Sequence, residues 1–411
     1  MSAGFKRNQT IKESALTGSW LRAINLLIEK QEDIELAIAF YDRENNKPTV
    51  VGNTKYYPIN DTFNNSKIKR LFNRYLHKIL FEEDLQKYLE IINDFSPDVI
   101  HVHGSEAPFG IIAKHTNIPV VLSIQGNLTV YNWKYFSGIN KDTVKNSISI
   151  SERIFSTGYG NYHTIFDKKA KREQEILVNI KHIIGRTDWD RRISKILAPK
   201  SKYYYNEEVL REPFYNNVCT PKIGTEFVIT TIMRPSTYKG LEVILKAAEL
   251  LSLLNGQNFR WMIGGISKHD KIVKLSMQQA ELTKLKDNIS FLGIVNTNEI
   301  IDLFQKTNVY IVPSHIENSS ILLSEAMISQ LPVICTYAGG MTSRITDGKE
   351  GLVIQSGDPW SLAGAIIEII EDYPQALQYG QNARKRALYR HNPKTIANDL
   401  LEIYKTILKT S

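Results

Sequence analysis

The chain has little cysteine and no long hydrophobic run. Only Cys219 and Cys335 occur among 411 residues, too few and too far apart for a disulfide framework or a thiolate metal site. No stretch approaches the roughly eighteen consecutive apolar residues of a membrane-spanning helix. The first residues, MSAGFKRNQTIKES, lack the apolar core of a signal peptide. These absences predict a cytoplasmic protein with reduced cysteines.

Nucleic-acid-binding signatures are also missing. There is no zinc-finger, homeodomain or ribonucleoprotein pattern, and basic residues do not alternate with aromatic residues in a short motif. The net charge is nevertheless +8, and most of the surplus lies in residues 1–212. Such a surplus favours a phosphate-bearing substrate or an anionic membrane surface, although scattered surface lysine gives the same sum. We expect no nucleic-acid partner.

Short apolar runs alternate with helical patterns along the chain, most regularly after residue 223. Strands are predicted at 226–233, 259–263, 289–292, 309–312, 331–335 and 351–354, with helices after Gly240 and from Lys271 and Thr297. The first half repeats this style, with strands at 34–40, 99–103, 120–124 and 182–185. Residues 374–408 read as helices. The pattern predicts an α/β protein with doubly wound parallel sheets.

Two carboxylates flank the junction between the predicted strand 309–312 and the predicted helix 321–330. Glu317 lies in the loop, and Glu325 lies roughly 8 Å along the helix from Ser320. A carboxylate can accept hydrogen bonds from two vicinal hydroxyls, and backbone amides at a helix start can bind phosphate. The spacing suits a ligand with two diols and a diphosphate, although a helix glutamate is more often a solvated surface residue.

Two cations occur where another predicted strand meets its helix. In the segment MRPSTYKG, Arg234 and Lys239 precede Gly240 and the helix that follows it. Positive charge beside a helix N-terminus stabilises the negative charge that grows on a leaving diphosphate. An ordinary pair of surface cations is the simpler alternative for these two residues taken alone.

Taken together, these motifs resemble the retaining glycosyltransferases of family 4, which act in bacterial surface-polysaccharide synthesis. The resemblance is strong over residues 223–359 and weak before them. It implies the GT-B fold, in which two Rossmann-like domains face each other across a cleft. We expect an acceptor-side domain at 1–212, a nucleotide-sugar-binding domain at 213–385, and a C-terminal helix at 386–411 that crosses back to the first domain.

The resemblance also implies roles for the donor-side residues. Arg234 and Lys239 would neutralise the diphosphate, Glu317 would bind the donor sugar near the reacting centre, and Glu325 would bind ribose. Phosphate would bind at Asn318, Ser319 and Ser320. The glycines Gly264 and Gly265 match those beside the nucleotide base, and a simple turn explains them equally well.

On the acceptor side, Thr17-Gly18-Ser19 matches the glycine loop that faces the donor. Arg186, within the segment GRTDWD, would lie near the cleft between the domains, and His103 would contact the acceptor. Gln125 stands where family members commonly have a histidine. Because glutamine cannot take a proton, it would only hydrogen-bond the acceptor or the sugar.

Two further departures concern the start of the chain and the Gly339-Gly340 turn. The apolar first strand that the family places before its glycine loop is missing, since polar residues precede Gly18, and we hypothesise that Met1 is an internal start. After Gly339-Gly340, Ser343 replaces a common glutamate and Arg344 follows it. A third carboxylate is therefore not expected in the donor site.

Neither a metal nor a cofactor is expected. Asp188-Trp189-Asp190 matches the manganese-binding acids of the other major glycosyltransferase fold, but a three-residue match is weak and the two cations make a metal redundant. His101 and His103 alternate along a predicted strand, so they line one face of it, and a metal or acid-base role is not assigned to them. The predicted enzyme is metal-independent.

Residues 67–92 read as an amphipathic helix in which Lys67, Lys69, Arg70 and Arg74 are interspersed with apolar residues. It either covers the first sheet or lies on an anionic membrane.

The sequence thus predicts a retaining glycosyltransferase that moves a hexose-type unit from a nucleoside-diphosphate sugar to a glycan or lipid-linked saccharide. The alternatives are a sugar-nucleotide epimerase on the same fold and a non-catalytic nucleotide-sugar-binding or scaffold protein.

Overall fold

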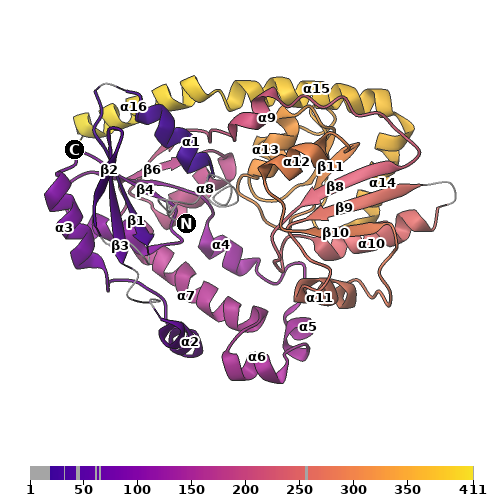
Figure 1. The fold of residues 1–411 in the computed structure, drawn as a ribbon, viewed down its shortest axis with the longest axis horizontal. Coiled ribbons are helices and arrows are strands. Elements are labelled where there is room, and N and C mark those ends of the chain that lie inside the picture. Colours follow the sequence, from indigo (N-terminus) through magenta and orange to yellow (C-terminus); the bar gives the residue numbers. More distant parts are fainter. Residues whose placement is uncertain are drawn as a thin grey trace. The chain divides into compact units, whose positions relative to one another are not determined.

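The computed structural model describes residues 19–31, 33–42, 47–60, 63, 66–254 and 258–410. The chain divides into two compact units (Figure 1). The first unit contains residues 1–132, 149–209 and 391–411, and the second contains residues 133–148 and 210–390. The chain therefore changes unit after residues 132, 148, 209 and 390, whereas the predicted domains are divided only at 212 and 385.

The second unit is built on a parallel sheet of six strands in the order β10-β9-β8-β11-β12-β13. This is the doubly wound order. The first three strands, β8 to β10, extend the sheet to one side, and the fourth, β11, starts its extension to the other side of β8. The predicted strands of this unit are confirmed. They are β8 (Phe227–Ile232), β9 (Phe259–Gly264), β10 (Ile289–Gly293), β11 (Val309–Val312), β12 (Val333–Thr336) and β13 (Leu352–Ile354).

Helices pack on both faces of this sheet because its central strands are apolar on both sides. All four residues of β11 are buried. Tyr310 and Val312 belong to a core shared with α9 (Glu212–Asn216), α12 (Thr297–Phe304), α13 (Ile321–Ile328) and α15 (Tyr373–Arg390). A second group of helices packs together and consists of α10 (Leu241–Ser252), α11 (Lys271–Gln279) and α14 (Pro359–Glu371).

The first unit contains a parallel sheet of four strands, in the order β4-β5-β6-β7, and a separate sheet of three strands, β1-β3-β2. The parallel sheet consists of β4 (Ile100–His103), β5 (Val120–Ser123), β6 (His182–Gly185) and β7 (Lys202–Tyr205). In the smaller sheet β1 (Leu36–Asp42) runs parallel to β3 (Thr54–Asn60), and β2 (Thr49–Val51) runs antiparallel to it. The sequence pattern did not predict β2, β3 or β7.

Helices at the two ends of the chain pack together in the first unit. The helix α1 (Ser19–Ile28) contacts α16 (Pro393–Thr410). Ile24 and Ile28 of α1 share a core with Ile396 and Leu400 of α16. The expected C-terminal helices are thus confirmed, and α16 lies in the first unit whereas α15 lies in the second.

The prediction of a single helix over residues 67–92 is wrong. The segment forms α2 (Lys67–Tyr75) and α3 (Leu85–Phe95), separated by residues without regular helix. Tyr88 of α3 is buried in the core of the parallel sheet, whereas α2 has no buried residue. Only α3 therefore covers a sheet. Packing on a sheet does not explain the apolar residues of α2.

The predictions for Thr17, Gly18 and the missing first strand concern residues outside the described ranges. Among the helices of the described ranges, none is both long and apolar enough to cross a membrane.

Candidate functional site

The predicted donor-side residues follow the carboxyl ends of neighbouring strands in the second unit. Arg234 comes two residues after β8, Gly265 directly follows β9, and Glu317 follows β11. In open parallel sheets, ligands bind outside the carboxyl ends of the strands where the strand order reverses, which here is between β8 and β11. The sequence thus places its candidate residues on the edge of the sheet that usually binds ligand.

Lys239 and Glu317 form an ion pair between the ammonium group and Oε2 of the carboxylate. Both side chains are largely buried, with exposed fractions of 20% and 13%. The backbone holds their two loops together, because the N–H of His315 donates to the carbonyl of Tyr238 at 2.9 Å. The predicted diphosphate-binding lysine and the predicted sugar-binding glutamate are therefore in direct contact.

Gly240 makes this approach possible. Its φ is +82°, in the left-handed region, and a β-carbon there would clash with the carbonyl of Pro313 at the end of β11. Gly339, with φ +56°, has the same relation to the carbonyl of Glu317, and the N–H of Gly340 donates to that carbonyl at 2.8 Å. Two glycine positions thus bring neighbouring loops against the segment that carries Glu317.

Glu325 is fully buried in α13 and accepts two hydrogen bonds from Arg211. Nε and Nη2 of Arg211 lie 2.7 and 2.5 Å from the two carboxylate oxygens, and Nη1 donates to Thr297 at 2.9 Å. The sequence pattern did not single out Arg211, since it precedes the short helix α9 in a stretch read only as a hinge. The ribose-binding role of Glu325 stays a prediction.

The loop between β11 and α13 is fixed by a buried cation. Arg344 is 1% exposed and donates to the hydroxyl of Ser319, and its Nη1 donates to Ser324 at 3.3 Å. Ser320 caps α13, since its hydroxyl accepts from the N–H of Leu323 at 3.2 Å. Sequence reasoning noted Arg344 only as a departure from the family and missed its contact with the predicted phosphate loop.

Gly265 has a local structural reason. Its φ is +84°, and a β-carbon would clash with the carbonyl of Met233, the residue before Arg234. The N–H of Met233 donates to Gly264 at 3.0 Å. The turn interpretation of these glycines is therefore supported, and the turn lies against the backbone of Met233, which precedes the exposed Arg234.

A histidine and a glutamate that sequence reasoning missed support the same loops. Nε2 of His315 lies 2.5 Å from Oε1 of Glu242 on α10, and Nδ1 lies 3.3 Å from the hydroxyl of Ser356. The N–H groups of Gly138 and Ile139 donate to the carbonyl of Thr237 at 3.1 Å. Residues 133–148 thus attach to the loop that carries Lys239.

In the first unit, the predicted acceptor-side residues lie at the carboxyl ends of three adjacent strands: His103 ends β4, Gln125 follows β5 and Arg186 follows β6. His103 stacks on His101 with ring centroids 3.9 Å apart. Burial, and second the Arg186 guanidinium, lower the pKa of His103 to about 3, so that its ring is neutral. Arg186 is 2% exposed and forms an ion pair with Glu208.

Glu106 also lies at this edge, and sequence reasoning missed it. A β-carbon on Gly104 would clash with its carboxylate and lie 3.0 Å from Gln125 Cγ. Its Oε2 is buried and has no hydrogen-bond partner among the residues that the structure describes. Burial raises the pKa of this carboxyl group. The sequence did contain a signal for Glu106, because it lies three residues after a predicted strand that ends in histidine.

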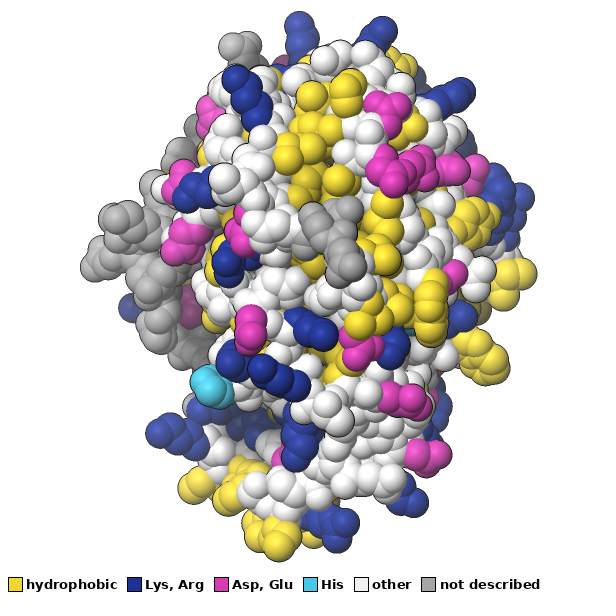
Figure 2. Space-filling view, turned by 90° about the vertical axis from the view of Figure 1, so that its right-hand side faces the viewer, with side chains coloured by type: hydrophobic (Ala, Val, Ile, Leu, Met, Phe, Trp, Pro, Cys, Tyr) yellow, Lys and Arg dark blue, Asp and Glu magenta, His cyan; other side chains and the backbone are white. Residues whose placement is uncertain are grey.

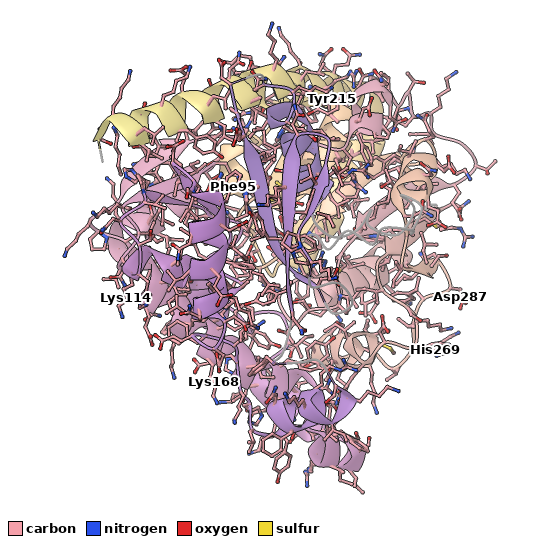
Figure 3. All side chains as sticks on the ribbon, turned by 60° about the vertical axis from the view of Figure 1, so that its left-hand side comes forward. Phe95, Lys114, Lys168, Tyr215, His269 and Asp287 are labelled. Carbon is pink, nitrogen blue, oxygen red and sulfur yellow. The ribbon has the colours of Figure 1, made fainter. Side chains whose placement is uncertain are left out.

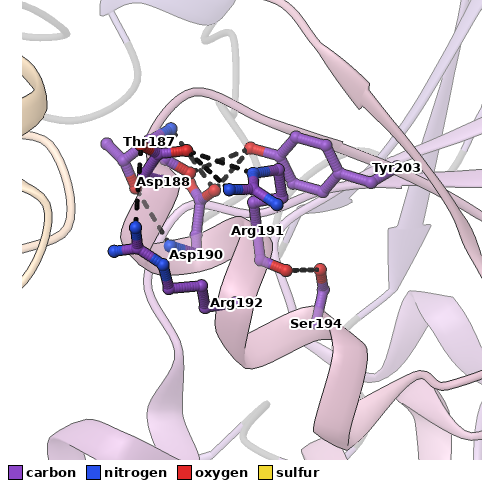
Figure 4. Close-up of polar contacts among 7 residues, drawn as sticks. All are labelled: Thr187, Asp188, Asp190, Arg191, Arg192, Ser194 and Tyr203. Atoms are coloured by element: carbon purple, nitrogen blue, oxygen red, sulfur yellow. Dashed lines mark hydrogen bonds and ion pairs between the residues drawn. The ribbon is translucent and has the colours of Figure 1, made fainter.

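The Asp188-Trp189-Asp190 segment serves the start of α8 (Asp188–Leu197), as Figure 4 shows. Asp190 accepts hydrogen bonds from the N–H groups of Arg186 and Thr187 and from the Tyr203 hydroxyl, at 3.1, 3.3 and 2.5 Å. Asp188 instead pairs with Arg191 at 2.9 Å. Capping explains Asp190, and an exposed ion pair in the first turn of α8 explains Asp188. In the described part of the chain, no group of three or more His, Cys, Asp or Glu residues could hold a metal ion.

The second unit has the sequence features of a known family. Residues 220–386 match the model of the glycosyl transferases group 1 family. The capsular polysaccharide biosynthesis glycosyltransferase CapM of Staphylococcus aureus is 24% identical over 189 residues, which cover 46% of this chain and 48% of CapM. The chain thus spans about half the length of this curated relative.

Solved structures resemble the chain over nearly its full length. Sucrose-phosphate synthase from Thermosynechococcus elongatus superposes with a TM-score of 0.69 at 16% identity, over 96% of this chain and 92% of that one. Alr3699/HepE of Anabaena, crystallised with UDP and glucose, gives a TM-score of 0.61 at 15% identity, over 95% and 96% of the two chains. The protein has the GT-B fold. Residues 220–386 are a group 1 glycosyltransferase domain.

Proposed function

We propose that this protein is a retaining glycosyltransferase that transfers a sugar from a nucleoside-diphosphate sugar to a glycan or lipid-linked saccharide in surface-polysaccharide synthesis. The observation that carries the proposal is the contact between Lys239 and Glu317 at the carboxyl ends of β8 and β11. In this proposal the cation binds phosphate and the neighbouring carboxylate accepts hydrogen bonds from sugar hydroxyls. Two similar proteins support the proposal. CapM is named for capsular polysaccharide biosynthesis, and Alr3699/HepE was crystallised with UDP and glucose.

In this proposal the donor lies along the carboxyl edge of the second unit. Arg234 and Lys239 neutralise the diphosphate, together with the loop Asn318, Ser319 and Ser320 at the start of α13. Glu317 accepts hydrogen bonds from the sugar hydroxyls. Glu325 binds ribose, with Arg211 setting the orientation of its carboxylate. Gly265 supports the base side through its turn against Met233.

The transfer breaks the bond between the anomeric carbon and the diphosphate oxygen and forms a bond from that carbon to the acceptor oxygen. The acceptor's proton passes to the departing diphosphate, on the same face of the sugar, so the anomeric configuration is retained. Lys239 and Arg234 stabilise the negative charge that develops on the diphosphate. No protein base takes the proton, which is compatible with Gln125 on the acceptor side.

We assign acceptor binding to the first unit, through His103, Gln125 and Arg186, and donor binding to the second. The two cations do the work that a divalent ion does in other transferases, so the enzyme is metal-independent. Full turnover in EDTA is the expected result. Loss of turnover in EDTA, restored by Mn²⁺ or Mg²⁺, would contradict it.

The decisive experiment incubates the protein with UDP-, GDP- and ADP-linked hexoses. Thermal shift in the presence of UDP or GDP tests whether a nucleotide binds. Product analysis with and without a saccharide acceptor then distinguishes the alternatives. Transfer needs acceptor and yields free nucleoside diphosphate, an epimerase changes the donor without acceptor, and a scaffold protein shows a shift but no product. An anomer of inverted configuration would contradict retention.

A lipid-linked acceptor would bring the enzyme to the inner face of the cell membrane as a peripheral protein. The basic first half of the chain supports this part of the proposal.

A further inference from the structure

The helix α2 exposes its apolar residues. Ile68 is 81% exposed, Phe72 is 56% exposed and Tyr75 is 58% exposed, and no residue of the helix is buried. A surface helix of a globular protein normally turns such residues toward a core, because burial of a large apolar side chain contributes about 1.5–3 kcal/mol. The apolar side of α2 therefore has no use within the unit to which it belongs.

A second helix extends this surface. On α6 (Ile150–Phe155), Ile150 is 78% exposed, Ile154 is 63% exposed and Phe155 is 50% exposed. Ile150 and Ile154 are four residues apart and so share one side of the helix. The helices α2 and α6 contact each other, and Figure 3 shows both at the lower end of the view, below Lys168. We call Ile68, Phe72, Tyr75, Ile150, Ile154 and Phe155 the α2/α6 surface.

The charge around this surface has one sign on the α2 side. Between Ser66 and Phe81 the chain contains no acidic residue and five basic ones, Lys67, Lys69, Arg70, Arg74 and Lys78. Lys78 lies over the ring of Phe72, with its ammonium nitrogen 5.6 Å from the ring centroid. The lower end of Figure 2, where α6 lies in Figure 1, also has hydrophobic side chains next to Lys and Arg. Apolar and cationic groups are therefore mixed on one surface.

We propose that the α2/α6 surface binds an anionic lipid bilayer. The apolar residues enter the boundary between headgroups and acyl chains, and the cations of α2 bind lipid phosphates. Each Lys or Arg near an anionic leaflet contributes about 1 kcal/mol of attraction. Apolar residues alone would suit a protein partner equally well, and it is the uniformly basic character of residues 66–81 that selects an anionic surface.

A second copy of this chain is a poorer occupant. In a two-fold dimer the same surface meets itself, so the basic residues of α2 would face the basic residues of the other α2. Like charges brought together across an interface are destabilising. The proposal depends on the proposed function only for its purpose, access to a lipid-linked acceptor, since membrane binding needs no turnover.

Flotation with vesicles tests the proposal. The full-length protein is mixed with vesicles of equal parts phosphatidylglycerol and phosphatidylcholine, or of phosphatidylcholine alone. We expect flotation with the anionic vesicles only, and weaker binding as the salt concentration rises. The double variant Phe72→Ser/Ile154→Ser and the double variant Lys67→Glu/Arg74→Glu should each reduce the bound fraction at least about tenfold.

Matched controls change exposed residues elsewhere in the first unit. Ile196 is 79% exposed on α8, and Lys200 is exposed after it. The variants Ile196→Ser and Lys200→Glu should float like the unchanged protein. Arg74 is half-buried and the other substituted side chains are exposed, and none of them is in a core, so melting temperature and thermal shift with UDP should be unaffected in every variant.

Three results would overturn the proposal. They are no flotation at low salt, equal binding to the neutral vesicles, or a dimer in light scattering that Phe72→Ser dissociates. Failure of the proposed function would appear separately, as intact flotation without any transfer product.

Discussion

Arg211 and Glu325 are 114 positions apart in sequence, yet the guanidinium of one holds both carboxylate oxygens of the other at 2.7 and 2.5 Å. Glu325 is fully buried and Arg211 is 11% exposed. The Arg211 guanidinium also lies over the ring of Phe214, 4.7 Å from its centroid. This pair ties the start of α9 to the middle of α13, the helix that follows the proposed phosphate loop.

The substitution Arg211→Met should strongly reduce stability, because it leaves the Glu325 carboxylate buried without this cation. The expected loss in the free energy of unfolding is about 3–5 kcal/mol, measured by urea denaturation. The control is Arg191→Met, which removes a pair with Asp188 whose side chains are 38% and 61% exposed, and it should cost less than about 1 kcal/mol. Equal losses in the two variants would show that Arg211 and Glu325 do not act as a buried pair.

Lys239→Met should lower kcat by about 100-fold or more, since it removes a cation from the leaving diphosphate. Glu317→Gln keeps the shape of the side chain and removes its charge, and it should mainly weaken donor binding. Lys246→Met is the matched control, because this lysine of α10 pairs with Glu249 and not with a loop of the site. Steady-state kinetics with the preferred donor would separate these effects. Normal turnover by Lys239→Met would refute the site assignment.

Gly240→Ala should both destabilise the protein and impair donor binding. The left-handed φ and the clash with the Pro313 carbonyl force the loop of Lys239 away from β11. We expect a loss of at least about 1–2 kcal/mol in unfolding free energy. Gly364→Ala in α14 is the opposite case, since a β-carbon there meets nothing within 4 Å, and it should stabilise the protein by about 0.5–1 kcal/mol.

His103 should make stability depend on pH. Burial and Arg186 lower its pKa in the folded protein from 6.5 to about 3, so below pH 6.5 the unfolded chain binds a proton that the folded protein does not. Stability should therefore be complete above pH 6.5 and fall on acidification toward pH 3, by up to about 1.4 kcal/mol per pH unit for this one group. His103→Gln should make the curve of unfolding free energy against pH less steep over this range. An unchanged slope would count against a buried neutral His103.

Local patterns in the sequence were sufficient for the second unit. Its strands are short apolar runs such as Val309–Val312, buried on both faces, and its helices begin at recognisable positions such as Gly240 and Thr297. The strand β3 was missed because Thr54–Asn60 contains Pro58 and several polar residues, and its partners are fixed only by the tertiary fold. Residues 76–84 interrupt the predicted long helix. This break was missed because hydrophobic periodicity alone does not show where a helix ends.

The candidate site was predictable only in part. Lys239 and Glu317 belong to motifs with fixed spacing from strand ends, so their approach follows from the sheet order. Arg211 and Glu242 belong to no such motif, and their contacts with Glu325 and His315 depend on segments brought together over long distances in sequence. Arg344 was noticed as an unusual residue, but the direction of its side chain could not be read from sequence.

Residues 133–148 belong to the second unit although the first unit continues on both sides of them, so the polypeptide passes between the units at four places. Neither unit can be released by a single proteolytic cut, and a fragment of residues 210–390 would lack the strap that Gly138 and Ile139 fasten to Thr237.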